Sequence, residues 1–180
     1  MLRRLFTLVL AFSPLLFFAH LAAQSPKDPL NDDEIEQVRE YANQPNERLK
    51  LYQKFIDQRI EAITRLSSDK KAPNRTAEIR ARMEEFTSLV DELQDNLDTY
   101  DHDHADIRKA LKSLAEASPK WEPALHLPET SPIYDFDRKS AIEAATSAVD
   151  QIKQIQNEQE KYFIEHKDQA GKNGTGPQGY

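Results

Sequence analysis

Hydrophobic residues recur along most of this chain at alternating steps of three and four positions, the spacing that places side chains on one face of an α-helix. The longest of these runs keeps its phase from its first member to its last. Its members are Ile79, Met83, Phe86, Val90, Leu93, Leu97, Tyr100, His104, Ile107, Leu111, Leu114 and Ser118. With Asn74 as the N-cap, the run predicts one unbroken helix over residues 74–118, about 67 Å long at the α-helical rise of roughly 1.5 Å per residue.

A run of the same kind precedes it. Its members are Ile35, Val38, Ala42, Pro45, Leu49, Tyr52, Ile56, Arg59, Ile63 and Leu66. Asn31, with Glu34 three residues later, forms the capping-box pattern that starts a helix. Pro45 keeps the phase, so it either kinks one helix or begins a second one after a short break at Asn43 and Gln44. The break is slightly favoured, and it would give a short fourth helix at one end of the bundle.

A third run begins at Ser131 and Pro132, an N-cap followed by proline at the first helical position. Its members are Tyr134, Arg138, Ala141, Ala145, Ala148, Ile152, Ile155, Gln159 and Tyr162. The connection before it carries Trp121, Leu125 and Leu127, which we expect to cover one end of the core. Each of these runs marks one buried helix face, which we call a seam. Three long seams with short or moderate connections predict an all-α protein, an elongated antiparallel three-helix bundle with coiled-coil-like packing.

The two ends of the chain differ from these runs. Residues 1–23 combine Arg3 and Arg4, an apolar stretch and then Ala22 and Ala23, which is the order of a secretory signal peptide. An uncleaved membrane anchor is the alternative, because the apolar stretch is almost long enough to cross a bilayer. We expect a signal peptide at 1–23, a short linker at 24–30, the helical bundle at 31–167 and a flexible glycine-rich tail at 168–180. Either way, the protein is expected to work outside the cytoplasm, in the periplasm or secreted.

Composition excludes several classes of function. The sequence has no cysteine, so it can form no disulfide and hold no iron–sulfur cluster. All four glycines lie in the tail, whereas phosphate-binding loops, dinucleotide-binding motifs and nucleophile elbows all require glycine. Lys plus Arg is 24 against 31 Asp plus Glu, a net charge of −7; losing Arg3 and Arg4 with the leader leaves 22 minus 31, or −9. Such an acidic protein is a poor partner for nucleic acid or anionic lipid.

Several metal-ligating residue types gather between Asp98 and Asp106. On a straight helix, His102 shares its outward face with Asp98 and Asp106, four residues away on either side. This ladder could hold a divalent metal weakly with help from water or a second chain, and no other cofactor is expected. A solvated acidic face is the favoured interpretation, and the metal-binding ladder is the alternative. His102 and His104 point in nearly opposite directions on such a helix, so they cannot chelate one ion together.

His104 falls on the inward seam, where an imidazole has to find a hydrogen bond. We expect it to be a buried polar residue that fixes the register of the helices. The alternative is a ligand-binding or pH-sensing position with Tyr41 nearby. Arg59 and Gln159 also interrupt their seams, and both side chains are long enough to reach the bundle surface.

By elimination, these observations favour a non-enzymatic exported protein with a structural or protein-interaction role in the cell envelope. It would present long helix faces to another protein or to a second copy of itself, without nucleic acid and, after signal cleavage, without a membrane. The alternative is a bundle that binds a divalent metal or a small ligand through Asp98, His102 and Asp106. An enzyme is the least favoured class, because no nucleophile and base stand at a recognisable spacing.

Overall fold

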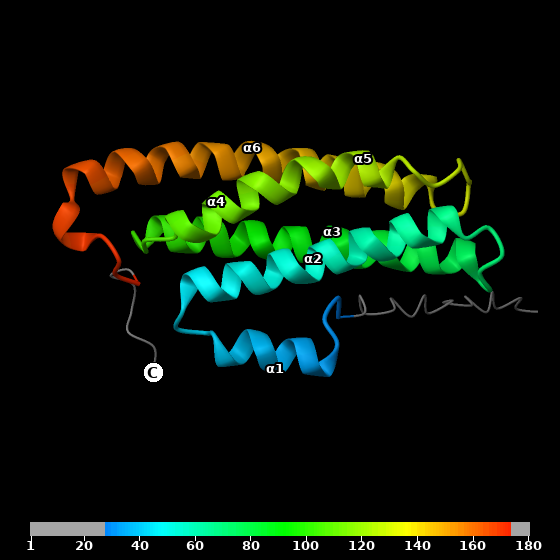
Figure 1. The fold of residues 1–180 in the computed structure, drawn as a ribbon, viewed down its shortest axis with the longest axis horizontal. Helices are drawn as coiled ribbons and strands as arrows, with labels where there is room; N and C mark the ends of the chain where they lie inside the picture. The colour runs from blue at the N-terminus through cyan, green and yellow to red at the C-terminus, as the bar shows by residue number, and fades with distance from the viewer. Residues whose placement is uncertain (1–27, 174–180) are drawn as a thin grey trace, which may run out of the picture.

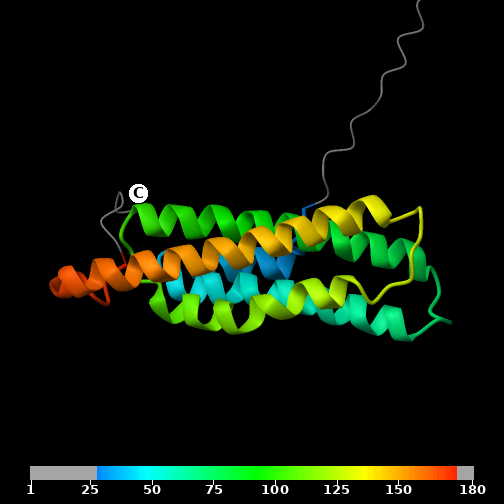
Figure 2. The same ribbon diagram turned by 90° about the horizontal axis from the view of Figure 1, so that it is seen from above.

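The computed structural model describes residues 28–173, and within them every regular element is helical (Figure 1). The elements are α1 (Asp32–Glu40), α2 (Pro45–Ser68), α3 (Arg75–His102), α4 (Arg108–Ala117), the 3₁₀ turn η1 (Ser118–Lys120), α5 (Trp121–Leu125), α6 (Asp135–Glu165) and the 3₁₀ turn η2 (Lys167–Gln169). The longer helices run along the long axis of an elongated molecule (Figures 1 and 2). The all-α prediction is therefore confirmed for the described residues.

The prediction of one unbroken helix over residues 74–118 is wrong, and the prediction of a three-helix arrangement is wrong with it. Helix α3 ends at His102, the chain reverses through residues 103–107, and α4 starts back at Arg108. Helix α4, η1 and α5 together form one bent leg beside α2, so the bundle has four legs instead of three (Figure 1). Helices α2 and α6 each contact α3 on one side and this bent leg on the other, which closes the legs into a ring. Successive legs run in opposite directions.

Helix α1 is a short additional helix that folds back along the outside of α2 (Figure 1). The break before Pro45 is confirmed, because α1 ends at Glu40 and Pro45 is the first residue of α2. The capping box is also confirmed: the Glu34 N–H donates to Asn31 Oδ1, and the Asn31 N–H donates to Glu34 Oε2, both at 3.0 Å. The break reverses the chain, so α1 does not continue the line of α2.

The core contains most residues of the predicted seams, although Ala42 and His104 are exposed. The fully buried residues include Leu49, Ile56, Ile63, Ile79, Met83, Phe86, Val90, Leu93, Leu97, Ile107, Leu111 and Leu114. On α6 the inward positions Ala141, Ala145 and Ala148 are also fully buried. These short side chains let neighbouring legs approach α6 closely.

Side chains of the bent leg cover one part of this core. Trp121 is buried, its ring meets Phe86 edge-on at a centroid distance of 6.0 Å, and its Nε1 donates to Asp57 Oδ1 at 2.8 Å. Leu125 is buried as expected, but Leu127 is exposed, so the prediction that it covers the core is wrong.

Helix α6 begins at Asp135, a few residues after the predicted start. Ser131 and Pro132 lie in the turn before it, where the Ser131 carbonyl accepts from the N–H groups of Tyr134 and Asp135. Between residues 28 and 173, no helix is both long and apolar enough to cross a bilayer. The expected signal peptide at 1–23 and the end of the tail, 174–180, lie outside the described residues.

Candidate functional site

The residues predicted to form a metal ladder are separated by the end of α3. Asp98 and His102 lie on the last turns of α3 with exposed side chains, whereas Asp106 lies beyond the helix, in the reversal. Asp98 Oδ1 accepts a hydrogen bond from Gln151 Nε2 of α6 at 2.6 Å. The four-residue spacing from His102 to Asp106 therefore does not correspond to one turn of helix. Within residues 28–173, no group of three or more His, Asp or Glu side chains is placed to hold a metal ion.

Asp106 is instead the anchor of a local hydrogen-bond cluster. Its two carboxylate oxygens accept from Nε and Nη2 of Arg108 at 2.8 and 2.7 Å, and Oδ2 also accepts from the Gly171 N–H at 2.7 Å. The hydrogen bonds from Arg108 are the main reason why the pKa of Asp106 lies below its usual value. Residues 171–173 belong to the predicted flexible tail, yet Lys172 O accepts from the Asp106 N–H and Asn173 Nδ2 donates to Asn43 O.

His104 is exposed, so the prediction that it is a buried register residue is wrong. Its backbone has a positive φ of 55°, in the left-handed region where a reversing chain most often uses glycine or asparagine. Its ring stacks on Tyr162 of α6 at a centroid distance of 4.2 Å, and Tyr162 also stacks on His166 at 4.1 Å. The expected partner Tyr41 has no part in this stack.

Two amide side chains from distant helices hold the reversal. Asn46 Nδ2 of α2 donates to Asp106 O at 2.6 Å, and its Oδ1 accepts from the Ala110 N–H at 3.0 Å. It therefore caps the first turn of α4 from another helix. Gln159 of α6 is 2% exposed; its Oε1 accepts from the Ile107 N–H at 3.3 Å and its Nε2 donates to Asp101 Oδ1 at 3.0 Å. The expectation that Gln159 reaches the surface is wrong, because its amide satisfies the backbone of the reversal.

Arg59 is also buried instead of reaching the surface, with only 7% of the residue exposed. It donates two hydrogen bonds to Glu34 of α1, at 2.5 and 2.8 Å, one to Glu85 of α3 at 3.1 Å and one to Pro29 O at 2.7 Å. Burial raises the pKa of Glu34, but hydrogen bonds from Arg59 and the Asn31 N–H outweigh it and hold the pKa below 4.5. This cluster fastens α1 to α2 and α3.

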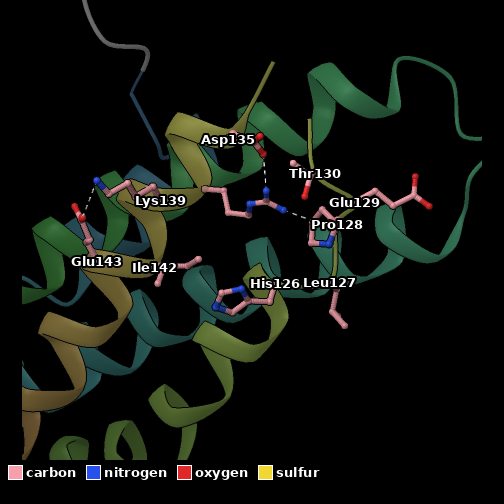
Figure 3. A pocket seen from close by; sticks show the side chains of 10 residues that line it. His126, Leu127, Pro128, Glu129, Thr130, Asp135, Lys139, Ile142 and Glu143 are labelled. Carbon is pink, nitrogen blue, oxygen red and sulfur yellow. Dashed lines mark hydrogen bonds and ion pairs between the residues drawn. The ribbon is translucent and has the colours of Figure 1, made fainter. Parts of the chain in front are cut away.

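A groove of about 710 Å³ lies at the other end of the bundle, between the α5–α6 connection and the first turns of α6 (Figure 3). Leu127, Pro128 and Ile142 supply apolar lining. Arg138 fixes the shape of the groove, because Nη1 donates to Pro128 O at 3.0 Å and Nη2 pairs with Asp135. The connection is fixed a second time by buried Tyr134, whose hydroxyl donates to the backbone carbonyl of residue 129.

Charged side chains of both signs surround this groove. Lys139 and Glu143 pair one helical turn apart at 3.8 Å, and His126 lies 3.6 Å from Glu122 (Figure 3 shows the first pair). At least half of each of these side chains is exposed. Exposed ion pairs contribute little to stability, so the charges of Lys139 and Glu143 remain available to a partner.

Exposed apolar residues lie on the same connection and on the first turn of α6. Leu127 is 55% exposed, Ile133 57% and Phe136 80%; Ile164, at the far end of α6, is the only other large hydrophobic residue exposed among the described residues. We call Leu127, Ile133 and Phe136, together with the groove that Leu127 helps to line, the α5–α6 end surface. The sequence analysis did not predict this surface. Ile133 and Phe136 do not belong to the seam that begins at Tyr134, and large apolar residues outside a seam are expected to be exposed.

Comparison with models of protein families, with curated proteins and with solved structures gave no match to this chain.

Proposed function

We propose that this chain is a non-enzymatic, exported helical-bundle protein that works by binding protein, and that the α5–α6 end surface makes the contact. The observation that carries the proposal is that Leu127, Ile133 and Phe136, all exposed, fall within residues 127–136, on the α5–α6 connection and the first turn of α6. Exposing large apolar side chains in a group costs free energy in water, and such groups commonly mark interaction sites. This differs from the expectation that long helix faces would make the contact.

The surface combines features that favour protein recognition over small-molecule chemistry. Arg138 and Tyr134 hold the connection rigidly, so little order has to be gained on binding. The surface includes one exposed aromatic residue, Phe136, and charged side chains at the groove; exposed aromatic residues are common in protein contact sites. The buried polar groups Arg59 and Gln159 are engaged in bonds that hold the fold, which supports a role without catalysis.

Work outside the cytoplasm is part of the proposal and rests on the order of residues in the leader, 1–23. Mass spectrometry of the protein from its producing cells tests it. A mature chain that begins near Gln24 is expected, and a chain that retains the leader would contradict cleavage.

Site-specific photo-crosslinking tests the contact itself. A photoreactive amino acid at position 136 is expected to give one dominant adduct in the producing cells, and the same group at position 164 serves as the matched control. Replacing Ile133 with serine should weaken the adduct at 136. Adducts of equal yield at both positions, or none at either, would refute protein binding at the α5–α6 end surface.

A further inference from the structure

A pocket of about 290 Å³ lies beside the α3–α4 reversal, at the opposite end of the bundle from the α5–α6 end surface. Its lining comes from α2, the reversal, α4 and the C-terminal segment: Asn46, Asp106, Arg108, Lys109, Lys112 and Gly171. Hydrogen bonds fix its walls, because Asn46 bonds to the reversal and to α4, and Asp106 accepts from the Gly171 N–H. A pocket held in this way can bind a ligand with little loss of conformational freedom.

The charge of this pocket is unbalanced. Three lining residues are cations and one is an anion, a surplus of two positive charges on a chain that carries −7. The one anion, Asp106, is already paired with Arg108 through two hydrogen bonds. Glu160 of α6 also acts on Arg108, but it does not line the pocket. Lys109 and Lys112 are exposed, and within residues 28–173 neither has an ion-pair or hydrogen-bond partner for its side chain.

Other cations at pockets of this molecule are paired. In the α5–α6 groove, Arg138 pairs with Asp135 and Lys139 with Glu143. The pocket beside the reversal therefore differs from that groove, because two of its cations are left without a counter-ion.

The arrangement of these cations is unfavourable without an anion. Lys109 and Lys112 are three residues apart on α4, and like charges at this spacing repel each other. Arg108 and Lys109 lie in the first turn of α4, at the positive end of the helix dipole, and that turn holds no acidic residue. An anion between the two lysines relieves both repulsions.

We infer that this pocket binds a compact anion of the phosphate type, held by the side chains of Lys109 and Lys112. A phosphate group carries about −1.5 to −2 near neutral pH, which matches the surplus of two positive charges. Lysine binds phosphate as a point charge. Arg108 adds a fixed positive charge, since Asp106 holds it and its guanidinium lies 4.6 Å from the ring centroid of Phe163. The inference concerns a different surface from the proposed contact with protein and does not depend on it.

Isothermal titration of the purified chain with inorganic phosphate tests the site. At an ionic strength of about 0.15 M, where long-range attraction is screened, one saturable equivalent per chain is expected. Replacing both pocket lysines, Lys109→Gln with Lys112→Gln, should weaken the binding about tenfold or more, because both free cations are lost.

The matched control is the double variant Lys120→Gln with Lys153→Gln. These two lysines are exposed and lie outside the pocket, and their loss changes the net charge of the chain by the same amount. This variant should weaken phosphate binding less than about twofold. Circular dichroism should show the same helix content in both double variants, because all four side chains are exposed.

Three results would overturn the inference. They are the absence of saturable phosphate binding, binding that the loss of Lys109 and Lys112 leaves unchanged, and equal weakening by the two double variants. Equal weakening would mean that phosphate responds to the charge of the whole chain and not to the pocket.

A second arm identifies the source of the phosphate group, which occurs on soluble compounds and on lipid headgroups. It uses phosphatidylcholine vesicles with and without phosphatidic acid, whose headgroup is a phosphate ester. Vesicle binding that requires phosphatidic acid, and that is lost with Lys109 and Lys112, assigns the site to a lipid headgroup. Binding of inorganic phosphate without vesicle binding assigns it to a soluble phosphate compound.

Discussion

The buried cluster around Arg59 allows a quantitative test of what holds α1 in place. Arg59→Met keeps much of the length of the side chain and removes its charge and its hydrogen bonds. Glu34 is then left as a carboxylate with 6% exposure, and only the charge of Lys54 still acts on it favourably. Glu85 is affected less, because Arg82 also pairs with it at 2.5 Å.

The cost follows from this geometry. Removing one partner of a buried ion pair typically costs about 3–5 kcal/mol, because the other charge remains buried. We expect Arg59→Met to lower the free energy of unfolding by about 3 kcal/mol, a large part of the roughly 5–15 kcal/mol of a typical domain. Adding Glu34→Gln removes the stranded charge and keeps an acceptor for the Asn31 N–H, since glutamine also serves in a capping box. The double variant should therefore recover about 1–2 kcal/mol of that loss.

Urea unfolding followed by far-UV circular dichroism measures these free energies. Arg80→Met is the matched control, because Arg80 makes its ion pairs with a half-exposed side chain and should cost no more than about 0.5 kcal/mol. A cost for Arg59→Met as small as that of the control would refute the reasoning. A double variant that is no more stable than Arg59→Met would refute it too.

The same pair predicts the response to acid. The pKa of Glu34 in the folded protein lies below 4.5, its ordinary value, so its stabilising contribution is complete above that pH and is lost as the pH falls through the lowered pKa. The Arg59 pKa is raised above an already high value, so Arg59 keeps its charge throughout this range. Wild type should therefore lose more stability than Glu34→Gln on acidification below 4.5, as measured by urea unfolding at each pH.

Three further predictions concern the reversal and the acidic face. Gln159→Leu should lower the free energy of unfolding by about 1–3 kcal/mol, because the buried Ile107 N–H loses its acceptor; urea unfolding measures this loss. His104→Leu should be less stable than His104→Gly by roughly 1 kcal/mol in the same assay, since leucine tolerates the left-handed backbone poorly. Asp91→Asn should raise the thermal midpoint at neutral pH, because a raised pKa means that the charged carboxylate is less favourable in the folded protein than in the unfolded chain. The gain in thermal midpoint should shrink as the pH falls through the raised pKa of Asp91. A gain that grows in acid would contradict this prediction.

The seams could be predicted from sequence because each helix of the bundle buries one face, and this places hydrophobic residues three and four positions apart along the chain. Ile79, Leu97, Ile107 and Leu114 are all fully buried, as their spacing predicted. The same spacing continues through residues 103–107, so it gave no sign that the chain reverses there. The steps from Leu97 through Tyr100 and His104 to Ile107 continue the helical rhythm by coincidence, although the chain between them is not helical throughout.

The reversal could not be found from local signals because its stabilising partners are remote. No glycine or proline marks it, and His104 adopts the positive φ that glycine often supplies. Asn46 reads as an ordinary polar residue after Pro45, and Gln159 as a polar interruption of a seam. Their roles depend on contacts with residues more than fifty positions away. The end surface was missed for a different reason, since Leu127 was expected to pack inward with Trp121.

The way the reversal is held also bears on how long the folded protein survives. Helices α2 and α3 form one antiparallel pair and the bent leg with α6 forms another, and both pairs can assemble from neighbouring parts of the chain. Asn46 belongs to the first pair, and its hydrogen bonds to Asp106 and Ala110 join that pair to the bent leg, so these bonds require the two pairs to be docked. Contacts made late in folding are absent from the transition state, and they act mainly on the unfolding rate. We therefore expect loss of the Asn46 amide to shorten the lifetime of the native bundle more than it slows the formation of the bundle.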